Sequence, residues 1–136
     1  MLVDIVSQNG NLLLNFQLPN SGQLNPDELK VLRGITDWMA VNSEGIYGTR
    51  PWKIYGEGPS THLKGPRRAM NEGARKLLTA SEVRFTTKRN TLYAFIMGWP
   101  EGDAVVQALG TASPQSPEKI ERVELLGYHG SLKWTQ

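Results

Sequence analysis

The stretch EVRFTTKRNTLYAFIMGWP, residues 82–100, decides the fold. In its first half the apolar Val83 and Phe85 alternate with polar and charged residues, the period of a strand with one buried face. A turn at residues 89–90 leads into residues 91–99, which are apolar on both faces and predict a second, central strand. Two strands joined by so short a turn are expected to pair antiparallel.

Further strand patterns follow towards the C-terminus. Residues 104–109 and 119–126 are strand candidates, and in 131–136 the apolar Leu132 and Trp134 alternate with polar residues. Short strands separated by turn-rich segments are typical of an antiparallel β-sandwich. We therefore expect a mainly β fold that ends in a C-terminal sandwich.

The N-terminal third has a different pattern of apolar residues. The chain opens with a short apolar helix, and the continuous apolar run of residues 11–16 predicts a strand buried on both faces. Asn25 is a good helix N-cap, with Pro26 in the first turn of a helix expected to end near Val41. Residues 1–45 therefore resemble a helix-strand-helix piece of a repeating α/β architecture. Its apolar faces need a partner, either the rest of that architecture or a second copy of the chain.

The segment between these parts is rich in aromatic residues, glycine and proline. We expect a linker and crossing loop over 46–80, which divides the chain into 1–45, 46–80 and the sandwich 81–136. Trp52 follows Pro51 in this connection and is a possible anchor between the two regions.

Composition excludes several classes of function. Fifteen basic and 13 acidic residues leave a formal charge of +2, so nucleic-acid binding is not predicted. The basic loop 64–76 is an exception, for which a solvated crossing between domains is the favoured interpretation. No apolar run is long enough for a membrane span, no signal peptide is seen, and there is no cysteine. His62 and His129 lack metal-ligand spacing, so neither a metal nor a cofactor is predicted.

The carboxylates have structural interpretations. Those near the helix start fit the helix dipole, and most of the others lie in turns or on the solvated side of strands. Glu57, between two glycines, is the least easily explained. Trp99 and Trp134 are interpreted as core residues rather than as a sugar-stacking platform.

Four stretches, taken in order, resemble the α-L-fucosidases of glycoside hydrolase family 29. MLVDIVSQNGNLLLN (1–15) resembles the last helix–strand passage of the family's (β/α)8 barrel, and NSEGIYGTRPWKIYGEGP (42–59) resembles the exit from it. EVRFTTKRNTLYAFIMGWP (82–100) and IERVELLGYHGSLKWTQ (120–136) resemble the C-terminal sandwich. After residue 15 the chain departs from the family's usual Gly-Pro turn, so the rim of the site is expected to differ.

The resemblance implies a retaining enzyme that removes terminal α-L-fucose from fucosylated glycans. It also implies that the aspartate nucleophile and the glutamate acid/base lie upstream, so we expect no catalytic residue in this chain. Asn15, where a barrel strand should end, is the candidate for contact with the sugar, and its alternative role is to hold the following loop. A secreted, periplasmic or lysosomal enzyme is implied, although the chain itself assigns no compartment. The alternative function is a stand-alone carbohydrate-binding or interaction module.

Overall fold

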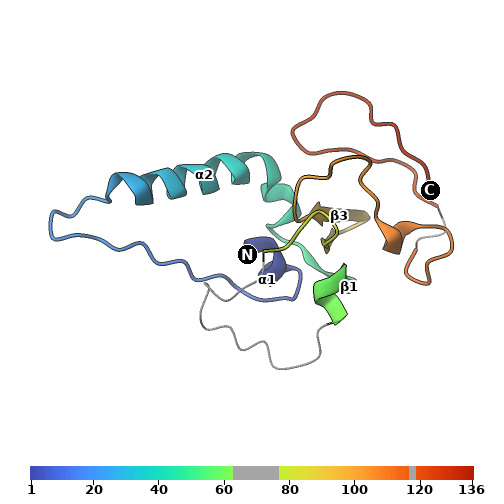
Figure 1. The fold of residues 1–136 in the computed structure, drawn as a ribbon, viewed down its shortest axis with the longest axis horizontal. Helices are drawn as coiled ribbons and strands as arrows, with labels where there is room; N and C mark the ends of the chain where they lie inside the picture. The colour runs from blue at the N-terminus through green and yellow to red at the C-terminus, as the bar shows by residue number, and fades with distance from the viewer. Residues whose placement is uncertain (63–76, 117–118) are drawn as a thin grey trace.

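The structure, a computed structural model, describes residues 1–62, 77–116 and 119–136 (Figure 1). The basic loop 64–76 therefore lies outside the described residues. The described chain contains two α-helices, three strands and three short 3-10 helices. The helices and strands are α1 (Leu2–Val6), α2 (Pro26–Asn42), β1 (Arg50–Glu57), β2 (Val83–Lys88) and β3 (Thr91–Ile96). The 3-10 helices are Ser43–Gly45, Pro59–His62 and Gln107–Leu109.

The three strands form one antiparallel sheet in the order β1-β2-β3. β2 and β3 are the predicted pair, with Val83 opposite Ile96 and a tight link in which Arg89 adopts a φ of 55°. The prediction that residues 91–99 form the central strand is wrong. β2 is central, because β1 pairs with its other edge, and its first four residues are buried.

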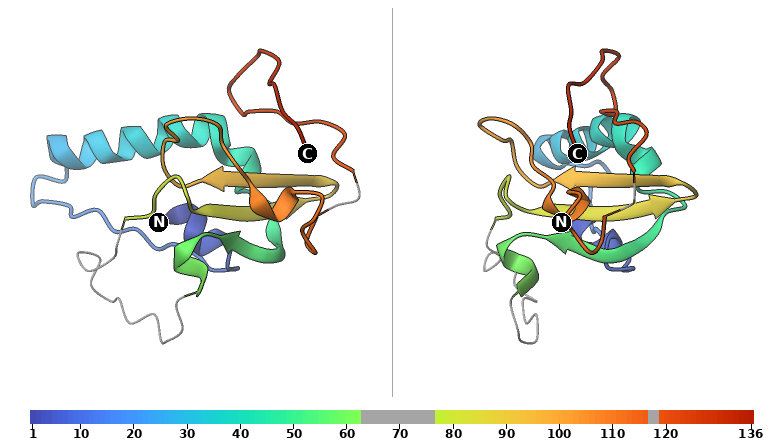
Figure 2. Two further views of the ribbon diagram at one scale, coloured as in Figure 1. Left: turned by 45° about the vertical axis from the view of Figure 1, so that its right-hand side comes forward. Right: turned by 90° about the vertical axis from the view of Figure 1, so that its right-hand side faces the viewer.

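β1 lies within the segment 46–80 that the sequence assigns to a connection. Arg50 pairs with Thr87 at one end and Glu57 pairs with Val83 at the other, with an irregularity in between. Proline and glycine weaken a strand pattern, and here they accompany the irregularity rather than end the strand. Figure 2 shows β1 curving along one side of the sheet.

Both predicted helices are present. Asn25 caps α2 as expected, and its side chain accepts a hydrogen bond from the Glu28 backbone in a reciprocal capping box. The C-terminal end of α2 is attached to the sheet. The Thr86 hydroxyl donates to the Gly45 carbonyl at 2.7 Å, and the rings of Trp38 and Phe95 lie 6.2 Å apart. The rest of α2 extends away from the sheet and buries none of its residues (Figure 1).

The strand predicted over 11–16 is not formed. These residues have no regular secondary structure, and the side chain of Leu13 is 85% exposed. A strand is stable only beside another strand, and this segment pairs with none in the part of the chain that the structure describes. The apolar run is therefore left without the cover that its sequence requires.

The core lies on one face of the sheet. Val83 and Phe85 of β2 are fully buried there with Ala108, and partly buried apolar side chains of β1 and β3 surround them. Ala108 belongs to the 3-10 helix that replaces the strand expected over 104–109. The predicted strands 119–126 and 131–136 are also absent, so the described residues hold a single sheet.

The mainly β, antiparallel class is confirmed at the level of this sheet. Trp99 and Trp134 do not join its core, because their side chains are 94% and 40% exposed. The reason is topological, since among the described residues no second sheet lies opposite them.

Candidate functional site

Asn15 lies in the unpaired segment that runs from α1 towards α2. Its side chain is exposed, and Figure 1 shows this segment leading away from the sheet. The structure therefore does not bring Asn15 together with other candidate residues. Its contact with a sugar stays a prediction.

Trp52 is placed more definitely. Its ring meets the buried ring of Phe85 edge-on, with centroids 5.1 Å apart and an interplanar angle of 64°. This contact joins β1 to β2 inside the core cluster. It packs β1 onto the central strand of the same sheet, and a role of Trp52 as an anchor between the two regions stays a prediction.

Glu57 has a structural role in the fold. Its two carboxylate oxygens accept hydrogen bonds from the backbone N–H groups of Gln107 and Ala108, at 2.8 and 2.6 Å. These groups open a 3-10 helix, where unpaired N–H groups favour an anion. Glu57 therefore holds the loop around Ala108 against β1, and both of its oxygens are engaged.

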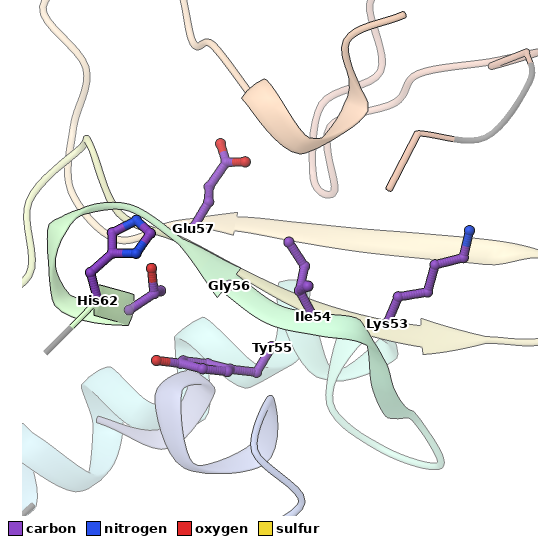
Figure 3. Close-up of a pocket in the computed structure, with 7 residues that line it drawn as sticks. Lys53, Ile54, Tyr55, Gly56, Glu57 and His62 are labelled. Carbon is purple, nitrogen blue, oxygen red and sulfur yellow. The ribbon is translucent and has the colours of Figure 1, made fainter. Parts of the chain in front are cut away.

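A shallow hollow on β1 does not make a convergent site. It is lined by Lys53 to Glu57, Thr61 and His62 (Figure 3). In the figure Ile54 and Glu57 point to one side of the strand, whereas Tyr55 points to the other. A binding pocket needs polar groups aimed at one point, which this arrangement does not supply.

The most concentrated polar chemistry surrounds Arg84 on β2. Its side chain is 1% exposed, and its Nε donates to the Asp4 carboxylate of α1 at 2.5 Å. One terminal nitrogen lies 3.2 Å from the Glu82 carboxylate, and the other donates to the Ser60 hydroxyl at 2.6 Å. Ser60 in turn donates its hydroxyl and its backbone N–H to Glu82, at 2.6 and 2.7 Å. We call Asp4, Ser60, Glu82 and Arg84 the Arg84 cluster.

Gly56, in β1, and Gly58, just beyond its end, make room for the Arg84 cluster. A Cβ on Gly56 would lie 2.9 Å from the Arg84 Cδ, and one on Gly58 would lie 2.8 Å from a Glu82 carboxylate oxygen. Gly58 also has a φ of 110°, which side-chain-bearing residues rarely adopt. Tyr55, which directly precedes Gly56 in β1, places its ring 5.5 Å from the guanidinium carbon, where a cation–π contact is favourable.

The Arg84 cluster keeps Glu82 ionised. Burial alone would raise the pKa of Glu82, but the Ser60 hydrogen bonds and the Arg84 charge together lower it. Because the pKa of Glu82 is lower in the folded chain than in the unfolded chain, its ionisation stabilises the fold at pH values above the ordinary glutamate pKa of about 4.3. This contribution is lost as the pH falls through the lowered pKa.

The sequence did not single out Asp4, Ser60, Glu82 or Arg84. Strict alternation placed Arg84 on the solvated side of its strand, because a charged residue opposite an apolar face normally meets water. The available signal was the pair of glycines around Glu57. Neither glycine carries a side chain, so at the end of β1 they leave room for a neighbouring side chain.

Neither a metal-ligand cluster nor a membrane-spanning helix occurs among residues 1–62, 77–116 and 119–136. In those ranges no three histidine, aspartate or glutamate side chains gather as a metal site would require, and His62 and His129 are both exposed. In the same ranges no helix is long and apolar enough to cross a membrane.

The sheet, its buried Arg84 cluster and the attached N-terminal helices define an antiparallel β domain preceded by two helices. Residues 1–44 match the family model for α-L-fucosidase, and residues 77–136 match the model for the α-L-fucosidase C-terminal domain. The chain belongs to the α-L-fucosidase family.

Three relatives show the extent of the similarity. The tissue α-L-fucosidase of Mus musculus is 30% identical over 135 residues, covering 99% of this chain and 24% of the relative. The α-L-fucosidase of Branchiostoma floridae is 29% identical over 134 residues, covering 98% of this chain and 24% of the relative. The tissue α-L-fucosidase of Homo sapiens is 28% identical over 136 residues, covering 98% of this chain and 23% of the relative. The chain thus spans about a quarter of the length of these relatives.

Proposed function

We propose that this chain is the C-terminal part of a retaining α-L-fucosidase that removes terminal α-L-fucose from glycoconjugates, and that it is not catalytic alone. The observation that carries the proposal is the ordered pair of family matches, first the enzyme model and then its C-terminal domain. The fold supports it, since the antiparallel sheet follows α2, a helix that buries none of its residues.

The chemistry of retention argues that the reacting groups lie outside this chain. A retaining glycosidase needs two carboxyls about 5–5.5 Å apart, one as nucleophile and the other as acid/base. Asp4 and Glu82 are bound to Arg84, and the Glu57 and Glu28 carboxylates accept hydrogen bonds from backbone N–H groups. These four carboxylates therefore hold the fold together, and we place the nucleophile and the acid/base upstream.

Residues 1–45 would then complete the barrel that carries the reacting groups. Their exposed apolar side chains need cover, which the rest of the barrel would supply. Those that are at least 45% exposed are Leu13, Leu18, Val31 and Val41. Self-association through the same residues is the competing way to cover them. In this arrangement Asn15 lies at the rim of the sugar site, and β1 joins residues 81–136 in the C-terminal domain.

The purified chain is expected to release no aglycone from an aryl α-L-fucoside above a buffer blank. A full-length α-L-fucosidase assayed in parallel shows that the substrate and conditions report turnover. Activity that survives repurification would overturn the proposal that catalysis lies upstream. A Glu57→Gln variant would then show whether the one carboxylate between two glycines is responsible.

The second candidate function is glycan binding by a stand-alone module. It is favoured by one observation, the 94% exposure of Trp99 next to a loop that contains Glu101 and Asp103. Aromatic faces and acidic side chains are typical of sugar sites. Saturable binding of a fucosylated glycan that is lost in Trp99→Ala would favour this candidate, and absence of binding at millimolar ligand would remove it.

A further inference from the structure

The Arg84 cluster connects segments that the two family models treat separately. Asp4 lies in the part that matches the enzyme model, whereas Glu82 and Arg84 lie in the part that matches the C-terminal domain. Ser60 comes from the segment between these matches. One buried guanidinium thus contacts all three parts of the chain.

The helix that carries Asp4 depends on its contacts with the rest of the fold. α1 has five residues, too few to be stable alone, and its N-cap makes no side-chain hydrogen bond. Val3 is its one buried apolar residue, and Ser7, just beyond its end, is fully buried. The Asp4–Arg84 ion pair is the charged contact that ties this helix to the centre of the sheet.

The orientation of α1 determines the direction in which the following segment leaves the helix. Asn9 adopts a φ of 63°, and the Gly10 N–H donates to the Ile5 carbonyl at 2.9 Å. A Cβ on Gly10 would lie 2.8 Å from the Ile5 side chain, so this turn is closed against the helix. The start of residues 11–16 therefore follows the orientation of α1.

We propose that Asp4 is a positioning residue, which through Arg84 fixes α1, and hence the start of the segment bearing Asn15, on the C-terminal sheet. The consequence for the sugar site rests on the proposed function. The attachment of α1 to the sheet does not rest on the proposed function, because it follows from the described contacts alone. If the proposed function holds, the C-terminal sheet determines the position of one edge of the barrel.

The test is amide hydrogen exchange measured by NMR on the 136-residue chain. The Ser7 and Gly10 amides, which donate to Val3 and Ile5, report on α1, and the Met97 amide, which donates to Glu82, reports on the sheet. In Asp4→Asn we expect exchange at Ser7 and Gly10 to accelerate at least tenfold while exchange at Met97 is unchanged.

Two further variants make the result specific. Asp4→Glu keeps the charge and should restore part of the protection of α1. Glu124→Gln removes a carboxylate from the exposed ion pair with Arg122 and should change none of the three amides. Unchanged exchange at Ser7 and Gly10 in Asp4→Asn would overturn the proposal, and so would an equal acceleration at Met97. Either outcome is independent of fucoside turnover, so failure here is distinguishable from failure of the proposed function.

Discussion

Replacing Arg84 by methionine is expected to lower the free energy of unfolding by about 3–5 kcal/mol, as when one partner of a buried ion pair is removed. Methionine fills much of the space of the arginine stem but leaves Glu82, whose side chain is 6% exposed, without its cation. Asp4 loses its partner at the same time. The loss is large because the Glu82 side chain is mostly shielded from water, so that solvent replaces the lost contact poorly.

Urea unfolding followed by circular dichroism measures this loss. Arg122→Met is the matched control, because it removes an arginine from an ion pair whose side chains are 77% and 63% exposed, and it should cost at most about 1 kcal/mol. Arg84→Lys keeps the charge but not the fork of donors, so its stability should lie between wild type and Arg84→Met. If Arg84→Met were as stable as Arg122→Met, the Arg84 cluster would not hold the fold together.

Phe85→Ala is expected to cost about 3–5 kcal/mol, the usual range for deleting a buried phenylalanine ring. The ring is 0% exposed and forms the centre of the core cluster with Val83 and Ala108. Its edge-to-face contact with Trp52 is lost as well, which adds the aromatic pair's own contribution of about 0.5–1.5 kcal/mol. A single small sheet has few other contacts that could close the cavity.

Trp99→Ala is the control for Phe85→Ala. It deletes a larger ring that is 94% exposed, and its stability should stay within about 0.5 kcal/mol of wild type. Thermal unfolding of both variants alongside wild type gives the comparison. A larger loss in Trp99→Ala than in Phe85→Ala would mean that the core is placed on the wrong face of the chain.

Local signals in the sequence predicted the elements that local chemistry determines. The cap at Asn25 with proline in the first turn marked the start of α2, and alternation around Phe85 marked β2. The two-residue link at 89–90 gave the antiparallel β2–β3 pair. Each of these features depends on residues close together in the chain, so pattern alone was sufficient.

Features that depend on distant partners were not predicted correctly. β1 pairs with β2, although a long segment separates the two strands in the sequence. The proline and glycine residues in and around β1 made this strand resemble a loop. Residues 11–16 have the composition of a buried strand, but the described chain supplies no neighbour for them. Trp99 was placed in a core because its run is apolar, whereas its exposure depends on what lies opposite the sheet.

The candidate site shows the same division. Glu57 could be recognised as unusual from its two flanking glycines, but its contact with the Gln107 and Ala108 amides spans 50 residues. The pairing of Asp4 with Arg84 spans 80 residues. No local pattern marks a charge that is buried only because its partner comes from so far away.

The most direct test of the central claim is the size of the native polypeptide in source cells, detected with an antibody raised against this chain. A C-terminal part of an α-L-fucosidase predicts a band of about four times the mass of these 136 residues, since the chain covers 24% of its relatives. An antibody-reactive protein of the mass of this chain alone, with no larger species before proteolysis, would contradict the account and favour an independent module.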